Sequence, residues 1–357
     1  MDATEKLLQE LTDAYGVPGH ESEIAAIMKK HLEADADEIG YDKLGSFIAT
    51  KKGTQERPRV MIAGHMDEVG FMVREIDKNG YIRFLSLGGW WGHVVLSQRV
   101  MILTKKGPVL GVVGSTPPHL LKDEDSKKVL QIKDMYIDVG VTSDVDIQKD
   151  LGVRIGDVIV PWSPFTVMNN EKMYVAKAFD NRIGCAIAIQ VMKMLKDDHP
   201  NTLYSVGTVQ EEVGLRGAMT SAWSVNPDVA LVSDVTVAKD YPGAEGEPTE
   251  KVGKGPAILV YDGSLVPNHK LRDLVIDTAE QNNIPYVLGA LEKGGTDGGS
   301  IHKSRFGVPT IFIGLVTRYI HGHASMIHRD DYDNCVKLFY EVTRKLDADT
   351  VASLTQA

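Results

Sequence analysis

Apolar residues recur at helical spacing in two stretches near the N-terminus of the chain. The first predicts a helix over residues 5–15 that ends at Gly16, and the second predicts a helix over residues 20–34. Two short apolar runs follow, at residues 46–50 and 60–64, and each predicts a strand.

From residue 68 to residue 164 the pattern changes to short β-type runs separated by turns. Asn79-Gly80 lies between two of these runs and is typical of a β-hairpin. The one long helical pattern in this stretch covers residues 123–132. The stretch therefore predicts a small all-β unit with strands at 70–76, 81–87, 99–104, 109–113 and 157–160.

Helices and strands alternate from residue 165 to the C-terminus. The predicted helices cover 182–196, 270–281 and 331–346, the last with Asp330 as its N-cap. The predicted strands cover 203–209, 229–232, 257–261, 285–288 and 309–315. Such alternation is typical of an α/β sheet. We therefore predict an α/β domain made of residues 1–67 and 165–357, interrupted by a β domain at 68–164.

Composition and charge exclude several classes of protein. Of the 357 residues, 43% are hydrophobic and 25% are charged, which is ordinary globular usage and excludes wholesale disorder. The net charge of −10 argues against binding to nucleic acid or to anionic membranes. Only 2 cysteines occur, and they form no CxxC pair. No signal peptide and no apolar run of about 18 residues is present, so we expect a cytoplasmic protein.

Polar residues that can carry chemistry follow several of the predicted strands. They are His65 with Asp67, Asp180, the pair Glu211 and Glu212, Asp234, and His321. Ligands of α/β sheets bind at the carboxyl ends of the strands, where these residues are expected to meet. Because residues i and i+2 of an extended segment share a face, Asp67 can orient the ring of His65.

Each of these residues also has an ordinary structural explanation. His65 can be a strand-end histidine whose ring is satisfied by Asp67, and Asp180 can cap the helix that follows it. The two adjacent glutamates can be exposed turn carboxylates, and Asp234 can be a turn residue.

Two further alternatives stay open from the residues alone. His321 lies in a segment that also contains His323 and His328, and the local pattern does not select one of the three. Gly294–Gly299 is not a nucleotide-binding motif, and we expect a tight loop whose backbone approaches a ligand.

The set as a whole predicts a metal centre. Two imidazoles and three carboxylates form the nitrogen and oxygen mixture that suits Zn²⁺, Co²⁺ or Mn²⁺. If one carboxylate bridges, five ligands can hold two ions about 3.5–4 Å apart. Since adjacent side chains point in different directions, one residue of the pair Glu211 and Glu212 can bind metal while the other serves as a general base.

At this point the chain resembles the tetrahedral-aminopeptidase and glutamyl-aminopeptidase family of di-metal exopeptidases, some members of which are labelled endoglucanases. The resemblance covers nearly the whole chain, and its motifs occur in the family's order. They are AGHMDEVG at 63–70, AKAFDNR at 176–182, VQEEVGLRG at 209–217, SDV at 233–235, GGTDGG at 294–299 and RYIH at 318–321.

The resemblance implies a role for each site residue. Asp180 would bridge two divalent ions, with Zn²⁺ preferred over Co²⁺ and Mn²⁺. His65 and Asp234 would complete one ion, and Glu212 and His321 the other. The catalytic residues would be Glu211, as the general base, and Asp67 behind His65.

The resemblance also implies the fold, the substrates and the assembly. The fold would be a mixed-sheet core sandwiched by helices, with an inserted barrel-like β domain used for dimerisation. The protein would be a metallo-aminopeptidase that releases N-terminal residues from short peptides. Its dimers would assemble into a tetrahedral dodecamer. The bond between Asp180 and Asn181 is expected to be strained and cis.

Two other functions remain as alternatives. A glycoside hydrolase of the endoglucanase type would use Glu211 and Glu212, although adjacent residues are awkward for two acids that must flank a sugar at ~5–9.5 Å. A non-catalytic metal-binding assembly protein would bind ions without cleaving aminoacyl-anilides. Only the peptidase is expected to lose hydrolytic activity when it is treated with a chelator.

Overall fold

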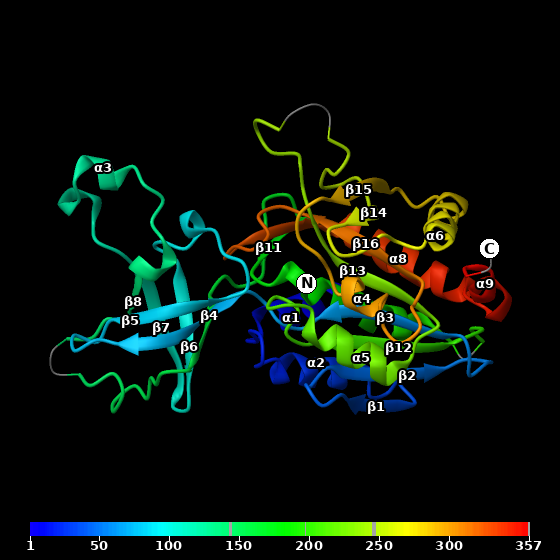
Figure 1. Ribbon diagram of the computed structural model, residues 1–357, viewed down its shortest axis with the longest axis horizontal. Helices are drawn as coiled ribbons and strands as arrows, with labels where there is room; N and C mark the ends of the chain where they lie inside the picture. Colours follow the sequence, from blue (N-terminus) through cyan, green and yellow to red (C-terminus); the bar gives the residue numbers. More distant parts are fainter. Residues whose placement is uncertain (143–144, 197, 245–247, 356–357) are drawn as a thin grey trace.

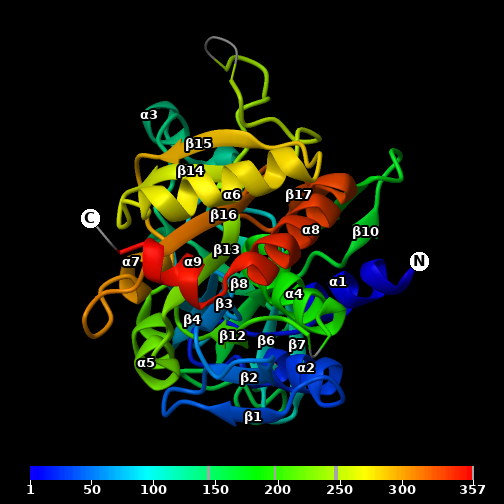
Figure 2. The same cartoon turned by 90° about the vertical axis from the view of Figure 1, so that its right-hand side faces the viewer.

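The chain folds into a large α/β lobe and a smaller β lobe, which lie side by side in Figure 1. The computed structural model describes residues 1–142, 145–196, 198–244 and 248–355. Both chain termini lie on the α/β lobe (Figures 1 and 2).

The α/β lobe is built on an eight-stranded mixed sheet. Its strand order is β1-β2-β12-β3-β13-β16-β14-β15. Strands β12, β3, β13 and β16 are parallel and form its centre, whereas β2 pairs antiparallel with β12, and β14 antiparallel with β16. The strands are β1 (Glu38–Tyr41), β2 (Phe47–Lys52), β12 (Thr202–Thr208), β3 (Arg59–His65), β13 (Val229–Val237), β16 (Thr310–Thr317), β14 (Ala257–Asp262) and β15 (Val287–Leu291).

Helices cover both faces of this sheet, as Figure 2 shows. The alternation of side chains along β3 explains why both faces are apolar: Val60 and Ile62 join one hydrophobic cluster, whereas Met61 and Ala63 join another. The helices over the first cluster are α1 (Ala3–Asp13), α2 (Ser22–Leu32), α4 (Phe179–Met194), α6 (His269–Gln281), α8 (Arg329–Lys345) and α9 (Ala348–Ser353). Those over the second are α5 (Arg216–Val225) and α7 (Gly298–Ile301).

The β lobe is a closed barrel with the strand order β4-β5-β8-β7-β6-β9. Inward-facing side chains such as Phe71, Val73 and Ile102 fill its interior. The strands are β4 (Gly70–Ile76), β5 (Ile82–Leu87), β6 (Arg99–Thr104), β7 (Gly107–Gly114), β8 (Tyr136–Asp138) and β9 (Val158–Pro161).

The remaining elements are short. A three-stranded sheet with the order β10-β11-β17 lies beside the α/β core. Its strands are β10 (Thr166–Val167), β11 (Met173–Ala176) and β17 (Ser325–His328). The short helices are η1 (Gly92–Val94), η2 (Pro118–Leu120), α3 (Asp123–Ser126) and η3 (Ile132–Asp134).

The mixed α/β core with a β barrel, expected from the sequence, is confirmed, but several elements differ. The helix predicted over 123–132 is reduced to α3, because residues 123–128 are all polar and give a longer helix no apolar face to pack, while Val129 stays 45% exposed. The strands that were not predicted are β1, β8, β10, β11 and β17, and the α-helices that were not predicted are α5, α7 and α9. The N-cap of α8 is His328, not Asp330: its ring nitrogen Nδ1 accepts a hydrogen bond from the backbone N–H of Asp330 at 3.2 Å.

Two other expectations concern domain limits and membranes. The barrel strands run from Gly70 to Pro161, inside the predicted unit at 68–164, whose limits and assembly role stay predictions. Within the described part of the chain, no helix is long and apolar enough to cross a membrane.

Candidate metal centre

One edge of the central sheet gathers all of the site residues predicted from the sequence. His65 is the last residue of β3, and Glu211 and Glu212 follow the neighbouring strand β12. Asp180 lies at the start of α4, which packs on the sheet, and His321 lies in the loop after β16. The sequence had indicated that Asp234 ends its strand, but Asp234 lies inside β13.

Asp180 stands between the two histidines. Its Oδ1 atom lies 3.1 Å from Nε2 of His65, and its Oδ2 atom lies 3.4 Å from Nε2 of His321. It does not cap α4: the N-cap is Ala178, and Asp180 itself has non-helical backbone angles. The Asp180–Asn181 bond is cis, as expected from the sequence.

The other acids complete two groups of possible ligand atoms. Glu211 and Asp234 approach Nε2 of His65 to 3.9 and 3.8 Å. Glu212 lies 3.5 Å from Nε2 of His321. Three-residue groups with ligand atoms within 4.8 Å of one another are His65 with Asp180 and Glu212, and His65 with Glu211 and Asp234. Glu211 is thus as close to a possible ion as the residues expected to be ligands. The distances alone therefore do not distinguish a metal ligand from a general base at this position.

Both histidine rings are oriented by backbone carbonyls. Nδ1 of His65 lies 3.0 Å from the carbonyl of Asp67, and Nδ1 of His321 lies 2.9 Å from the carbonyl of Gly89. A carbonyl can only accept, so Nδ1 is the donor in each pair. Nε2 of each ring therefore points its remaining position at carboxylate oxygens, which is the arrangement of a metal-binding histidine.

Asp67 contributes to the site mainly through the backbone of the two glutamates. Its oxygens accept hydrogen bonds from the N–H groups of Glu211 at 3.0 Å and Glu212 at 3.1 Å. Its carboxylate also lies 3.5 Å from Nδ1 of His65, farther than its own carbonyl. Asp67 is fully buried and thus holds the loop of the glutamates beside His65.

The structure separates the three histidines near the C-terminus. His321 joins the acidic cluster, whereas His328 caps α8. The ring of His323 packs 5.3 Å from Trp90, and neither ring nitrogen has a hydrogen-bond partner among the described residues. Burial lowers the pKa of His323 to about 4, so this ring is neutral.

The electrostatics of the cluster reflect an excess of buried negative charge. Burial, together with Asp180, raises the pKa of Glu212 to about 8. Burial also raises the pKa of Glu211 and of Asp234 well above their usual values. Burial disfavours the charged form of His321, but Asp180 and Glu212 outweigh it and raise the pKa of this histidine to about 10. Without a bound cation, protons on these groups therefore offset the negative charge of the cluster.

Divalent cations fit this donor set. The two Nε2 atoms face oxygens that can only accept when ionised, so either a proton or a cation must lie between them. The buried Oε1 atom of Glu212 has no hydrogen-bond partner among the described residues and is available as a ligand atom. Imidazole nitrogen and carboxylate oxygen without thiolate suit Zn²⁺, Co²⁺ or Mn²⁺.

A cavity of about 300 Å³ opens onto the cluster. Gly294, Gly295 and Thr296 form part of its wall, whereas Gly298 and Gly299, which were expected to continue this loop, begin α7. Apolar side chains of Val237, Leu291 and Ile320 line another part of the wall. The acids and the histidines of the cluster line the same cavity and are reached through it.

Two buried acids next to the site were not anticipated. Asp297, in the glycine loop, accepts a hydrogen bond from the hydroxyl of Thr208, and burial raises its pKa to about 6. Glu21 accepts hydrogen bonds from the N–H groups of Gly19 and Gln210. The glycine-rich surroundings of Asp297 were a weak signal for it in the sequence, whereas Glu21 had none.

A buried ion cluster lies next to the site residues Asp67 and Asp180 in the chain. The Oε1 atom of Glu68 lies 2.7 Å from the ammonium of Lys177 and 3.2 Å from the guanidinium of Arg182, and all three side chains are at most 2% exposed. The two cations also donate to the backbone carbonyls of Leu11, Ala14 and Gly16. The end of α1 is thereby tied to segments next to Asp67 and Asp180.

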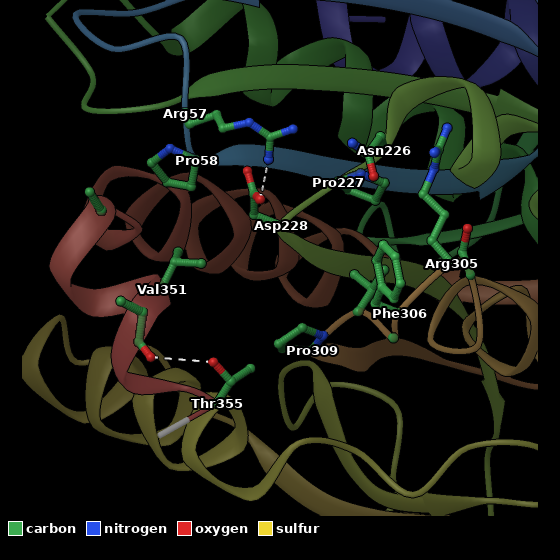
Figure 3. Close-up of a pocket in the computed structure, with 15 residues that line it drawn as sticks. Arg57, Pro58, Asn226, Pro227, Asp228, Arg305, Phe306, Pro309, Val351 and Thr355 are labelled. Atoms are coloured by element: carbon green, nitrogen blue, oxygen red, sulfur yellow. Dashed lines mark hydrogen bonds and ion pairs between the residues drawn. The ribbon is translucent and has the colours of Figure 1, made fainter. Parts of the chain in front are cut away.

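A second cavity lies at the opposite ends of the parallel strands. It measures about 570 Å³, and Figure 3 shows it between the ion pair of Arg57 with Asp228 and the side chains of Phe306 and Val351. Its walls include Pro58, just before β3, and Pro309, just before β16. None of the site residues lines this cavity.

Comparison with known proteins gives the family. The sequence profile of the M42 glutamyl aminopeptidase family matches residues 45–338. The putative aminopeptidase FrvX of Escherichia coli (strain K12) is 40% identical over 98% of this chain and 98% of its own length. The TET aminopeptidase of a marine sediment archaeon, Thaumarchaeota archaeon, is 46% identical, with a TM-score of 0.95 over 99% of this chain and 100% of that one.

Two more solved structures bear on assembly and on naming. The TET1 peptidase of Pyrococcus horikoshii, described as assembling into a tetrahedron or a large octahedral shell, has a TM-score of 0.84 and 28% identity over 96% of this chain and 100% of that one. A protein of Thermotoga maritima titled endoglucanase has a TM-score of 0.78 and 29% identity over 98% of this chain and 99% of that one. With a family profile that spans most of its length, this chain belongs to the M42 glutamyl aminopeptidase family and is a metal-dependent aminopeptidase.

Proposed function

We propose that this aminopeptidase holds two divalent ions per subunit, which Asp180 bridges, and releases N-terminal residues from short peptides. The observation that carries the proposal is the position of Asp180, whose two oxygens face two different histidines at 3.1 and 3.4 Å. In this assignment His65 and Asp234 complete the first ion, and Glu212 and His321 the second. Zn²⁺ is the preferred ion, with Co²⁺ and Mn²⁺ as alternatives.

Glu211 is the general base of the proposed reaction. Divalent ions at this position supply Lewis acidity, which lowers the pKa of water and polarises a carbonyl. Glu211 accepts the proton of the attacking water and delivers it to the leaving amine. Its buried position supports this role, because burial raises the pKa of the Glu211 carboxyl and favours a group that can hold a proton.

The free α-amine of the substrate selects the end of the peptide. It binds near one of the ions or one of the carboxylates that line the cavity. An internal peptide bond brings no free amine into the cavity. Binding of the amine therefore restricts cleavage to the first residue of the substrate.

Chelation followed by addition of single metals tests the proposal. The chelated protein should lose hydrolysis of a panel of aminoacyl-anilides, and Zn²⁺, Co²⁺ or Mn²⁺ should restore it. Retention of a glycosidase activity after chelation would favour the endoglucanase alternative. Metal binding without hydrolysis of any anilide would favour the non-catalytic assembly protein.

We also propose that the barrel mediates dimerisation and that dimers form a tetrahedral dodecamer. The outer face of the barrel carries exposed apolar side chains, including Leu85, Leu110 and Val112, which are 47%, 47% and 43% exposed. The assembly of the Pyrococcus horikoshii relative supports this proposal. Native mass spectrometry should show a dodecamer that L110E with V112E reduces to smaller species, and a monomeric wild-type protein would contradict it.

The cytoplasmic location stays a proposal as well. Both cysteines, Cys185 and Cys335, are buried and unpaired, which suits a reducing compartment. Cell fractionation with an antibody against the chain tests the location.

A further inference from the structure

The loop that carries the two glutamates is held by carboxylates from two distant segments. The backbone N–H of Gln210 donates to Oε1 of Glu21 at 3.0 Å. The next two N–H groups, of Glu211 and Glu212, donate to the two oxygens of Asp67 at 3.0 and 3.1 Å. Three successive backbone donors therefore bind side-chain acceptors from outside the loop.

This loop needs such acceptors because it belongs to no regular element. Strand β12 ends at Thr208 and helix α5 begins at Arg216, so the N–H groups between them have no ladder partner. Gln210 has a φ of 56°, in the left-handed region that a non-glycine residue rarely adopts. Such a conformation persists only when surrounding contacts hold it in place.

The side chain of Glu21 contacts the loop and not the helix that Glu21 precedes. It occupies the N-cap position of α2, yet its side chain makes no capping hydrogen bond to that helix. Its Oε1 atom instead accepts from the N–H of Gly19 at 2.7 Å and from that of Gln210. The residue is 5% exposed and does not line the cavity at the metal centre. Its side chain thus faces the loop and reaches neither substrate nor ion.

We propose that Glu21 is a positioning residue, which fixes the backbone of Gln210 and thereby the direction in which the Glu211 side chain enters the site. The inference rests on the proposed role of Glu211 as the base. Asp67 holds the N–H of Glu211 itself, and Glu21 fixes the residue before it. Loss of Glu21 frees the left-handed residue and misplaces the base, while Asp67 still holds the N–H of Glu212 and the ligands on other segments keep their places.

Steady-state kinetics of Glu21 variants test the proposal. E21A removes the acceptor and should lower kcat for an aminoacyl-anilide by about 10–100-fold. KM and the number of bound metal ions per subunit should stay near the wild-type values. E21Q keeps an oxygen acceptor in place of the carboxylate and should retain kcat within about 3-fold of the wild type, since hydrogen bonding and not charge is the function of this group.

A matched control separates positioning from general stability. Asp331 is also a buried carboxylate that accepts two backbone N–H groups, those of Gly253 at 2.6 Å and Gly255 at 2.7 Å, but it lies outside the site. D331A should lower the melting temperature and leave kcat unchanged. If E21A does not fold, E21D supplies the readout, because it keeps the charge but is one methylene shorter, and it should lower kcat at constant KM.

The results that overturn the inference are specific. A wild-type kcat in folded E21A or E21D would overturn the role of Glu21. An equal loss of kcat in E21Q and E21A would also overturn it. The variant E211Q, measured alongside, tests the proposed base separately. Full activity of E211Q would refute the role of Glu211, whereas an inactive E211Q with a wild-type E21A refutes only the role of Glu21.

Discussion

The Oδ1 atom of Asp180 lies 3.1 Å from Nε2 of His65, although the two residues are 115 positions apart in the sequence. The contact exists because α4 packs on β3, so the first turn of the helix lies over the end of the strand. Asn181 secures this position by donating to the carbonyl of Ser233 on β13 at 2.7 Å. The centre of the site is therefore set by helix-on-sheet packing.

Replacing the proposed base should separate catalysis from metal binding. E211Q keeps the size of the side chain but cannot accept a proton, so kcat should fall by about 10²–10⁴-fold. Metal content, measured by elemental analysis of the purified protein, should stay at the wild-type value. An E211Q protein that has lost its metal would show that Glu211 is a ligand, as its 3.9 Å approach to His65 also permits.

Replacing Asp180, the proposed bridging acid, should reduce metal binding more than replacing Asp234, a proposed ligand of one ion. D180A removes a ligand from both proposed ions, whereas D234A removes a ligand from one of them. Isothermal titration of the chelated proteins with Zn²⁺ should show two sites in the wild type, one in D234A and none in D180A. D228A, at the far cavity, is the control and should bind like the wild type. Two intact sites in D180A would refute the bridge.

Breaking the buried ion cluster should destabilise the fold strongly. Glu68 compensates both Lys177 and Arg182, and E68A leaves these two cations buried without their anion. We expect a loss of about 3–5 kcal/mol in the free energy of unfolding. Urea denaturation of the metal-loaded protein measures the change.

An exposed ion pair provides the comparison for this loss. Glu38 lies 2.8 Å from Lys52, with side chains 67% and 59% exposed. E38A should lower the free energy of unfolding far less than E68A, because solvent screens this pair. Equal losses in E68A and E38A would show that burial does not govern the contribution of Glu68.

The stability of the protein should respond to pH through Glu21. Burial, with a contribution from Asp67, raises the pKa of Glu21 from 4.5 to about 7. The folded state therefore binds more protons than the unfolded state between these values, and stability falls as pH rises from about 4.5 to about 7. E21Q cannot ionise and lacks this loss.

The melting temperature measures this effect as a difference between the two proteins. Between pH 5 and pH 8, the free energy of unfolding of E21Q should rise by up to about 2–3 kcal/mol relative to that of the wild type. A constant difference between the two proteins over this range would contradict the shifted pKa. H20Q, with a substitution at an exposed neighbour, should follow the wild-type curve.

The sequence predicted the parts of the fold that depend on local patterns. Nearly continuous apolar runs predicted β3 and β16, since strands buried on both faces are largely apolar. Short segments were harder, because β8 has three residues and is defined by its neighbours in the barrel. The pattern over 123–132 gave a helix only at its start, because its apolar residues all lie at its end, where Leu130 and Ile132 pack against the barrel interior outside α3.

The residue types of the metal centre were readable from the sequence only as a set, because two imidazoles and three carboxylates near apolar strands form a metal-binding mixture, although each residue alone has an ordinary structural explanation. Which of them meet was decided only by the tertiary structure. Packing of α4 on the sheet brings Asp180 between His65 and His321, and the loop after β16 presents His321 in place of His323. The contact of Glu21 with Gln210 left no trace in the sequence, since a backbone N–H has no side-chain signature and its acceptor comes from another segment of the chain.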